Sequence, residues 1–157
     1  MGGGGYGAPL VHKVRHVWHS SWRDFDVPQA QDERDLLVVV DMAVGVLRQG
    51  GSVVVNCYSG RGRSGAFAVL VAARLQGVRS HSQLVDVVVR MRENRDGILE
   101  TPQQFRFASR LLRLPSTARC GALCTARQWG QSEVVRLLLA ACLGALLIIR
   151  CCSPCAH

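Results

Sequence analysis

The sequence predicts an α/β fold, in which a central sheet is flanked by helices, and two observations lead to it. Residues 52–56 predict a strand, because their continuous apolar run, Val53-Val54-Val55, suits a buried position in a parallel sheet. On both sides of this run, apolar residues recur at helical spacing. The chain has 157 residues, of which 48% are hydrophobic, so we expect one domain with a modest core.

The part of the chain before this run predicts a strand, a loop and a helix. Residues 11–18 alternate partly between apolar and polar side chains, which predicts a strand, and residues 20–28 form a polar and aromatic loop. Residues 31–48 predict a helix, because Asp32, Glu33 and Asp35 suit the positive end of its dipole. The pair Gly50-Gly51 ends this helix.

Three further helices are predicted after the apolar run. Residues 64–75 form an apolar helix that stops before Gly77, and residues 80–92 carry one apolar stripe. Residues 94–97 predict a turn. Residues 101–112 predict a helix with Thr101 as its N-cap and Pro102 at its first position.

The remaining composition suggests a flexible glycine-rich lead at 1–10 and a Cys-rich, apolar tail at 115–157. The lead has no apolar stretch typical of a secretory signal. In the tail, 13 residues at 137–149 are uninterrupted and apolar, whereas a membrane-spanning helix needs about 20. We therefore expect a buried helix there. Cys151-Cys152 could accept lipid and anchor the chain to a membrane, the tail cysteines could bind zinc, or the tail could be unstructured.

Charge and cysteine usage limit the partners and the compartment. The formal net charge is +8, which favours anionic partners, but no aromatic RNA-binding motif or basic run accompanies it, so we expect no nucleic acid. The seven cysteines are an odd number, and Cys57 stands apart from the other six. This pattern argues against a disulfide framework and favours the reducing cytoplasmic side.

The most informative stretch of the chain is the loop after the predicted strand, at residues 57–65. Backbone N–H groups of a glycine-rich loop at the start of a helix bind anions. Arg63 adds a bidentate fork for phosphate oxygens. The same field lowers the pKa of Cys57 and favours a thiolate nucleophile. The loop therefore predicts a site that cleaves phosphate esters.

Three motifs carry a family resemblance. The loop resembles the Cys-x5-Arg phosphate loop of cysteine-dependent protein phosphatases, with Cys57 and Arg63 at its ends. Upstream, residues 22–28 (Trp-Arg-Asp-Phe-Asp-Val-Pro) resemble the acid loop of the classical protein-tyrosine phosphatases, Trp-Pro-Asp-x-Gly-x-Pro. Downstream, residues 93–107 resemble the family's glutamine loop, with five positions in register: Arg95, Gly97, Thr101, Gln104 and Phe107. Over residues 11–113 the chain thus resembles the C-terminal half of a receptor-type-like catalytic domain.

The resemblance implies a truncated tyrosine-phosphatase-like fold over 11–114 and a hydrolase that dephosphorylates phosphotyrosine-containing signalling proteins through a phosphocysteine intermediate. No cofactor and no metal are implied. Cys57 would be the nucleophile and Asp24 the general acid, with Asp26 as its rival. Ser64 would help the thiolate leave, and Gln104 would position water. The phosphate would bind to the loop residues Tyr58, Ser59, Gly60, Arg61, Gly62 and Arg63.

Four residues depart from the family pattern. Asn56 stands where the family has histidine, and Arg23 replaces the proline of the acid loop. Glu100 replaces the first glutamine of the glutamine loop, and its carboxylate should repel phosphate. Arg61 adds a second guanidinium, which could help bind anions. Asn56, Glu100 and the missing recognition loop support an alternative function, a catalytically weak module that binds phosphoproteins or a partner phosphatase.

The family's N-terminal half, with its tyrosine-bearing recognition loop, has no counterpart before residue 11. We therefore expect impaired activity, open strand edges and uncovered apolar helix faces. The apolar segment 134–149 is a candidate to cover part of that surface.

Overall fold

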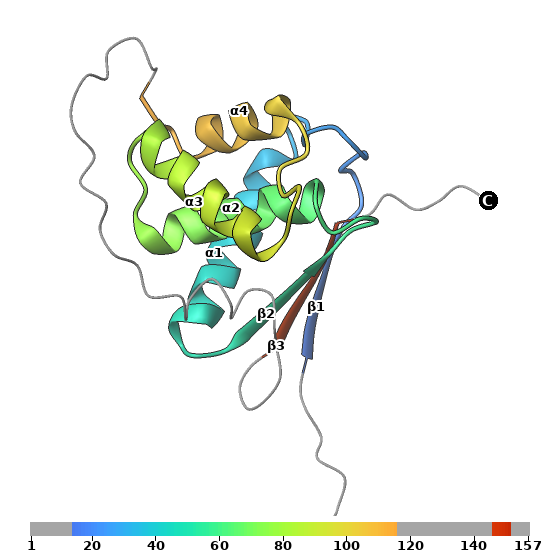
Figure 1. Cartoon of the computed structure of the whole chain (residues 1–157). Coiled ribbons are helices and arrows are strands. Elements are labelled where there is room, and N and C mark those ends of the chain that lie inside the picture. Colours follow the sequence, from blue (N-terminus) through green and yellow to red (C-terminus); the bar gives the residue numbers. More distant parts are fainter. Residues whose placement is uncertain (1–13, 116–145, 152–157) are drawn as a thin grey trace, which may run out of the picture.

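The computed structural model describes residues 14–115 and 146–151 and contains a sheet of three parallel strands. The strands are β1 (Val14–His19), β2 (Ser52–Asn56) and β3 (Leu146–Cys151), in the spatial order β1-β3-β2. Four helices lie to one side of this sheet in Figure 1. They are α1 (Glu33–Arg48), α2 (Arg63–Gln76), α3 (His81–Asn94) and α4 (Pro102–Leu111).

The four helices confirm the sequence prediction, with each end within two residues of the expected position. Their ends have local causes. Ser80 Oγ accepts a hydrogen bond from the Gln83 N–H at the start of α3. At the start of α4, Thr101 and Gln104 form a reciprocal capping box. Gly77 ends α2 in the left-handed conformation, with φ of 64°.

Strand β3 corrects the expectation of a helical apolar tail. Residues 146–149 are extended, and they pair with both neighbours: Ile148, for example, lies opposite His16 of β1 and Val54 of β2. The physical reason is the gap between two parallel strands, where a third strand satisfies backbone donors and acceptors on both sides. Two β-branched residues, Ile148 and Ile149, suit that position. The expectation that this segment covers open strand edges is confirmed for 146–149; residues 134–145 lie outside the described residues.

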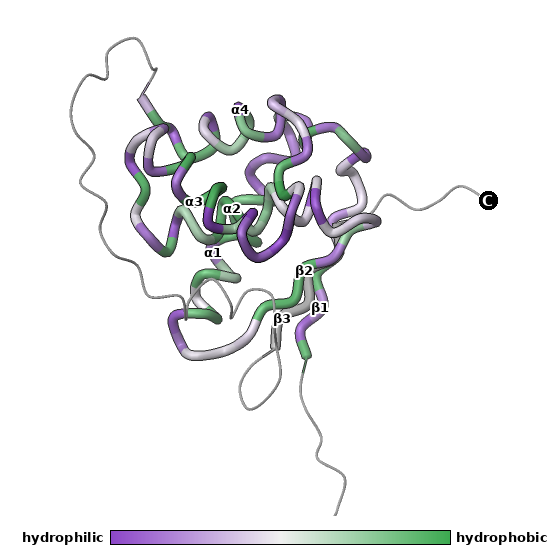
Figure 2. The backbone as a smooth tube through the Cα atoms, viewed as in Figure 1, coloured by the Kyte–Doolittle hydropathy of each residue, from purple (hydrophilic) through white to green (hydrophobic). Residues whose placement is uncertain are grey.

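Helix α2 forms the centre of the hydrophobic core. Eleven consecutive residues, Arg63–Ala73, are buried, because α1, α3 and α4 all contact this helix. A helix that is apolar all round is typical of such an enclosed position. Figure 2 shows hydrophobic stretches both in the helices and along β2, which leads directly into the loop before α2. The core therefore fixes the end of β2 and the start of α2, the two ends of the Cys-x5-Arg loop.

Part of the apolar surface is not covered by the described residues. Large apolar side chains are between 45% and 89% exposed at seven positions: Val14, Trp18, Phe25, Val38, Tyr58, Val85 and Val89. This exposure agrees with the expectation of uncovered apolar surface. Within residues 14–115 and 146–151, no helix is long and apolar enough to cross a membrane.

Candidate active site

The loop between β2 and α2 places Cys57 and the start of α2 around one point. Gly60 takes the left-handed conformation, with φ of 73°, and its N–H donates a 3.2 Å hydrogen bond to Cys57 Sγ. Gly62 is the N-cap of α2, and its carbonyl accepts from the Ala66 N–H at 2.8 Å. The free N–H groups and the positive dipole end of α2 therefore face the thiol, as an anion site requires.

The environment of Cys57 favours the thiolate. Partial burial by itself raises the pKa of this thiol, because desolvation penalises the charge. The side chain and backbone of Ser64, the Gly60 N–H and the Arg63 charge together outweigh this effect and lower the pKa below its ordinary value. Ser64 Oγ meets no described partner at full hydrogen-bond geometry, so its contribution comes from its closeness to the sulfur. A thiol in this environment ionises more readily than a free thiol.

Arg63 joins the phosphate loop to the acid loop. Its guanidinium is buried, and Nη1 donates to the Trp22 carbonyl oxygen at 3.0 Å. Nη2 lies 3.3 Å from Asp24 Oδ1. Trp22 is fully buried, and its indole N–H donates to the Asp26 carbonyl at 2.9 Å, which holds this loop against the core. The geometry thus brings the Asp24 carboxylate to Arg63 of the anion site, although the two residues are far apart in the sequence.

Asp26, the rival carboxylate, has a different environment. Its Oδ1 accepts from the Val27 N–H at 2.8 Å and from Gln103 Nε2 at 3.3 Å. The Asp26 carboxylate therefore stabilises the acid loop and connects it to α4. Of the two aspartates, Asp24 is the one that pairs with Arg63.

The glutamine loop brings Gln104 and Glu100 to the other side of the phosphate loop. Gln104 is fully buried, and its Oε1 accepts from the Thr101 N–H at 3.3 Å, which leaves Nε2 without a described partner. A Cβ built on Gly62 would lie 3.1 Å from Gln104 Nε2 and 2.5 Å from Glu100 Oε2. A side chain at position 62 would therefore displace the Glu100 carboxylate, and the amide and the carboxylate both reach this position.

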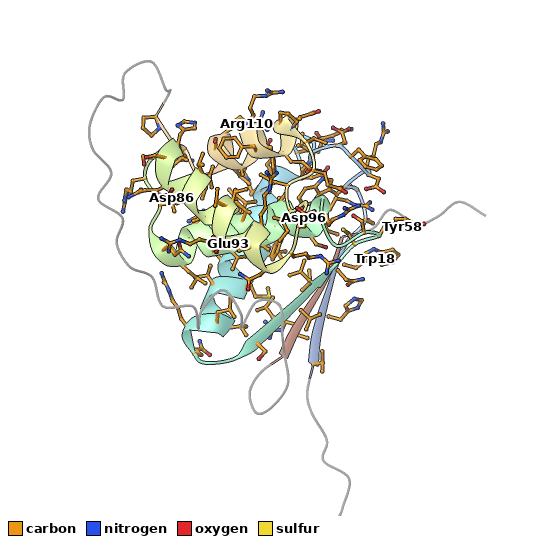
Figure 3. All side chains as sticks on the ribbon, in the orientation of Figure 1. Trp18, Tyr58, Asp86, Glu93, Asp96 and Arg110 are labelled. Carbon is orange, nitrogen blue, oxygen red and sulfur yellow. The ribbon has the colours of Figure 1, made fainter. Side chains whose placement is uncertain are left out.

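The predicted phosphate-binding residues form the rim of the loop. Tyr58 is 89% exposed and projects outward in Figure 3. Ser59 Oγ accepts from the Arg61 N–H at 3.3 Å, which tightens the turn. The Arg61 guanidinium lies 3.5 Å from Glu100 Oε1. A pocket of about 310 Å³ opens beside Cys57, and Tyr58, Ser59 and Gly60 line it.

The structure places the predicted site residues on the phosphate loop or against it, except that the Tyr58 side chain points outward, and it adds one residue that the sequence analysis did not assign to the site. Arg95 Nη2 donates to the Ser59 carbonyl at 2.9 Å, and its guanidinium lies against Gly60. This contact fixes the rim of the loop from the end of α3. The sequence contains an indication of this role, because Arg95 is one of the five positions in register with the glutamine loop.

Two buried donor atoms around the loop have no hydrogen-bond partner within the described part of the chain: Arg63 Nε and Gln104 Nε2. Buried polar atoms are normally paired, so unpaired donors that surround one loop indicate a site that receives acceptors from elsewhere. No cluster of His, Cys, Asp or Glu that could hold a metal is found among residues 14–115 and 146–151. The arrangement can bind a tetrahedral oxyanion, attack it with a thiolate and protonate a leaving oxygen.

Comparison with known proteins points to the same chemistry. The family model for protein-tyrosine phosphatase matches residues 6–113. Tyrosine-protein phosphatase non-receptor type 7 of Rattus norvegicus is 28% identical over 102 residues, which cover 64% of this chain and 28% of that protein. Receptor-type tyrosine-protein phosphatase R of Homo sapiens is 30% identical over 101 residues, which cover 63% of this chain and 15% of that protein.

A third relative, tyrosine-protein phosphatase non-receptor type 2 of Homo sapiens, is 29% identical over 97 residues, covering 60% of this chain and 23% of that protein. No solved structure gives a significant match. The chain thus spans between about a seventh and little more than a quarter of the length of these relatives. Since the family model matches well over half of the chain, and its Cys-x5-Arg loop is folded around a thiol and a buried arginine, the chain belongs to the protein-tyrosine phosphatase family.

Proposed function

We propose that this chain hydrolyses phosphotyrosine in proteins through a phosphocysteine intermediate at Cys57. In the first step the thiolate sulfur attacks phosphorus, and the bond between phosphorus and the tyrosine oxygen breaks. Arg63 and the backbone N–H groups at the start of α2 stabilise the equatorial phosphate oxygens. The lowered pKa of Cys57 supports this role, because it raises the fraction of the thiolate at any given pH.

Asp24 is proposed as the general acid for the leaving tyrosine oxygen. Its carboxylate pairs with Arg63 Nη2 at 3.3 Å. A phosphate bound to Arg63 competes for the same guanidinium, so Asp24 is displaced toward the leaving group. In its carboxylic acid form it then donates a proton to the phenolate, which is a poor leaving group without one.

The second step is hydrolysis of the phosphocysteine. Water attacks phosphorus, the bond between phosphorus and Sγ breaks, and Cys57 leaves as a thiolate that the Ser64 hydroxyl stabilises. Gln104 is proposed to position the water, since its buried Nε2 donor has no partner among the described residues and reaches the loop at Gly62. No cofactor or metal is needed for either step.

The observation that carries this proposal is the contact of three separate chain segments at one loop: Cys57 and Arg63 on the loop, the acid loop at Arg63, and the glutamine loop at Gly62. The expected partner is a phosphotyrosine-containing protein, and no nucleic acid is expected. A low-pKa thiol is readily oxidised, so we place the activity on the reducing cytoplasmic side.

The test is phosphate release from a phosphotyrosine peptide by the purified chain. The proposal expects turnover by the unchanged chain, none above background for Cys57→Ser, and normal turnover for Cys120→Ser. The control removes a thiol beyond residue 113, where the family match ends. Equal turnover by the unchanged chain and Cys57→Ser would refute the proposal.

The second candidate function is a module that binds phosphoproteins or a partner phosphatase with little turnover. Two observations favour it. The Glu100 carboxylate lies at the phosphate loop, where its charge repels phosphate. The chain also spans no more than 28% of the length of the relatives above. Calorimetric titration with the same phosphopeptide distinguishes the candidates. Binding that survives Cys57→Ser, together with no turnover by the unchanged chain, would favour the module; absent binding would exclude it.

The domain organisation remains a proposal: a lead at 1–10, a partial phosphatase domain at 11–114 and a separate tail at 115–157. The tail would add β3 to the sheet of the partial domain, and lipid on its cysteines could attach the chain to a membrane. Membrane fractionation before and after deletion of residues 129–157 tests the attachment, and an unchanged distribution would exclude it.

A further inference from the structure

We propose that Asp26 is a positioning residue for the general acid. Together with Gln103 of α4, it holds the acid loop in the shape that brings Asp24 to the phosphate loop. The inference rests on the proposed function, because it assumes that Asp24 protonates the leaving tyrosine oxygen. Asp26 stands where the acid-loop pattern of the family has glycine, so the contacts of its side chain have no counterpart in that pattern.

The first observation is an unfavourable backbone conformation next to Asp24. Phe25 lies between the two aspartates and has a φ of 57°, in the left-handed region that bulky residues rarely adopt. Its side chain is 66% exposed, so burial of the ring does not compensate for this conformation. A loop with such a residue keeps its shape only where the surrounding contacts hold it. The position of Asp24 therefore depends on the contacts that the rest of the acid loop makes.

The second observation is that Asp26 makes such contacts with both its backbone and its side chain. Its carbonyl oxygen accepts a hydrogen bond from the Trp22 indole N–H at 2.9 Å, which closes the loop. Its Oδ1 accepts from the Val27 N–H at 2.8 Å and from Gln103 Nε2 at 3.3 Å. The bond from Val27 fixes the local turn, and the bond from Gln103 connects that turn to α4. Substitution of Asp26 by a residue without an acceptor removes both side-chain bonds.

The third observation is that α4 supports both ends of the acid loop. Phe107 of α4 is buried, and its ring lies edge-to-face against Trp22 with 5.9 Å between the ring centroids. Gln103 lies in the first turn of α4, so the Asp26 carboxylate also lies near the positive end of this helix. Because Trp22 and Asp26 are both attached to α4, the segment between them, which carries Asp24, is held on both sides.

The effect on the reaction passes through Asp24. In the held loop, Asp24 Oδ1 lies 3.3 Å from Arg63 Nη2. When a phosphate takes this guanidinium, the fixed backbone limits the displacement of Asp24 to its side chain, which stays beside the phosphate. Asp24 then gives its proton to the leaving oxygen as the bond from that oxygen to phosphorus breaks. Loss of the Asp26 contacts therefore slows this protonation and leaves the Cys57 thiolate and the Arg63 guanidinium in place.

The test compares two small substrates that differ in their need for a proton. Phenyl phosphate releases a phenolate that needs one, whereas p-nitrophenyl phosphate releases an anion that is stable without one. The measured quantity is kcat/KM, which includes the first chemical step and not the second. In Asp26→Ala we expect kcat/KM to fall about fivefold for phenyl phosphate, the factor that corresponds to one hydrogen bond, and much less for p-nitrophenyl phosphate. The matched control is Asp86→Ala on the exposed surface of α3 (Figure 3), which should behave as the unchanged chain does with both substrates.

Two further variants separate positioning from acid chemistry and from structural damage. Asp26→Asn keeps an acceptor oxygen for both side-chain bonds but cannot act as an acid, so it should hydrolyse phenyl phosphate several-fold faster than Asp26→Ala. Gln103→Ala changes an exposed side chain of α4 and removes the bond between the acid loop and this helix. It should lower kcat/KM for phenyl phosphate about two- to threefold, and it should add no further loss to Asp26→Ala, because both act through one contact. Its control is Gln49→Ala, the same change at the exposed end of α1.

The outcomes are distinct. If Asp26→Ala and Gln103→Ala keep the kcat/KM of the unchanged chain for phenyl phosphate, or lose equally with both substrates, the inference is overturned and the proposed function stands. If Asp26→Asn is as slow as Asp26→Ala, the carboxylate itself is required as an acid, which also overturns the positioning role. If the unchanged chain hydrolyses neither substrate above the Cys57→Ser background, the proposed function fails and the inference fails with it.

Discussion

Two glycine-to-alanine substitutions test the packing that holds the active-site loop. Gly65 lies in the first turn of α2, and a Cβ there would stand 3.0 Å from the Leu99 backbone nitrogen and 3.2 Å from Ile98 Cγ2. Gly45 lies in α1, and a Cβ there would meet nothing within 4 Å. Both positions are helical, so alanine gains the same intrinsic preference at each, about 1 kcal/mol.

The difference between the two variants therefore isolates the steric cost at Gly65. The Leu99 segment cannot easily yield, because its N–H donates to the Arg61 carbonyl at 3.2 Å and its φ of 60° is already unfavourable for a leucine. Overpacking of this kind costs roughly 1–3 kcal/mol. We expect Gly45→Ala to raise the free energy of unfolding by about 1 kcal/mol, and Gly65→Ala to lie about 1–3 kcal/mol below it.

Urea unfolding followed by circular dichroism measures both variants, with equal slopes required for the comparison. Gly65→Ala should also slow aryl phosphate hydrolysis, since a displaced Leu99 moves the Arg61 carbonyl and with it the loop. The reasoning is refuted if Gly65→Ala is as stable as Gly45→Ala, because α2 would then not pack tightly against the 98–99 segment.

Three further predictions follow from the same geometry. Asp24→Asn should lower kcat by about 100-fold or more with phosphotyrosine and much less with p-nitrophenyl phosphate, whose leaving group needs no proton; equal losses would argue against an acid role. Alkylation of Cys57 by iodoacetamide should rise with pH through an inflection below that of a free thiol, since its folded pKa is lowered, and Ser64→Ala should move this inflection upward, since it removes one cause of the lowering. An unmoved inflection in Ser64→Ala would contradict the assignment of Ser64. Ile148→Pro should destabilise the fold by about 3 kcal/mol, because proline removes a ladder hydrogen bond in a strand paired on both sides; unchanged stability would contradict the position of β3.

The helices could be predicted from the sequence because their signals are local. Ser80, Thr101 and Gly77 mark helix ends by their own backbone and side-chain chemistry, and apolar spacing marks the faces between them. Strand β3 could not be predicted in this way. Residues 146–149 form a short apolar run that suits a helix or a strand equally, and only the gap between β1 and β2 decides between them.

In the site, too, local features could be predicted from the sequence and contacts between distant segments could not. Cys57 and Arg63 lie on one loop, so their spacing alone predicts an anion site. The contact of Asp24 with Arg63 joins distant segments and was reached only through the family resemblance. The ion pair of Arg61 with Glu100 and the bond from Arg95 to Ser59 depend on how the glutamine loop packs against the phosphate loop. The register of Arg95 with the glutamine loop predicts its place in the motif but not this contact.

The central claim is that Cys57 forms a covalent bond to phosphorus. Its most direct test is the intact mass of the chain after acid quenching during turnover of p-nitrophenyl phosphate, followed by peptide mapping. We predict one phosphoryl group, located on Cys57, in the unchanged chain, and none in Cys57→Ser. Phosphate release without any phosphoryl group on Cys57, or with the group on another residue, would contradict the account.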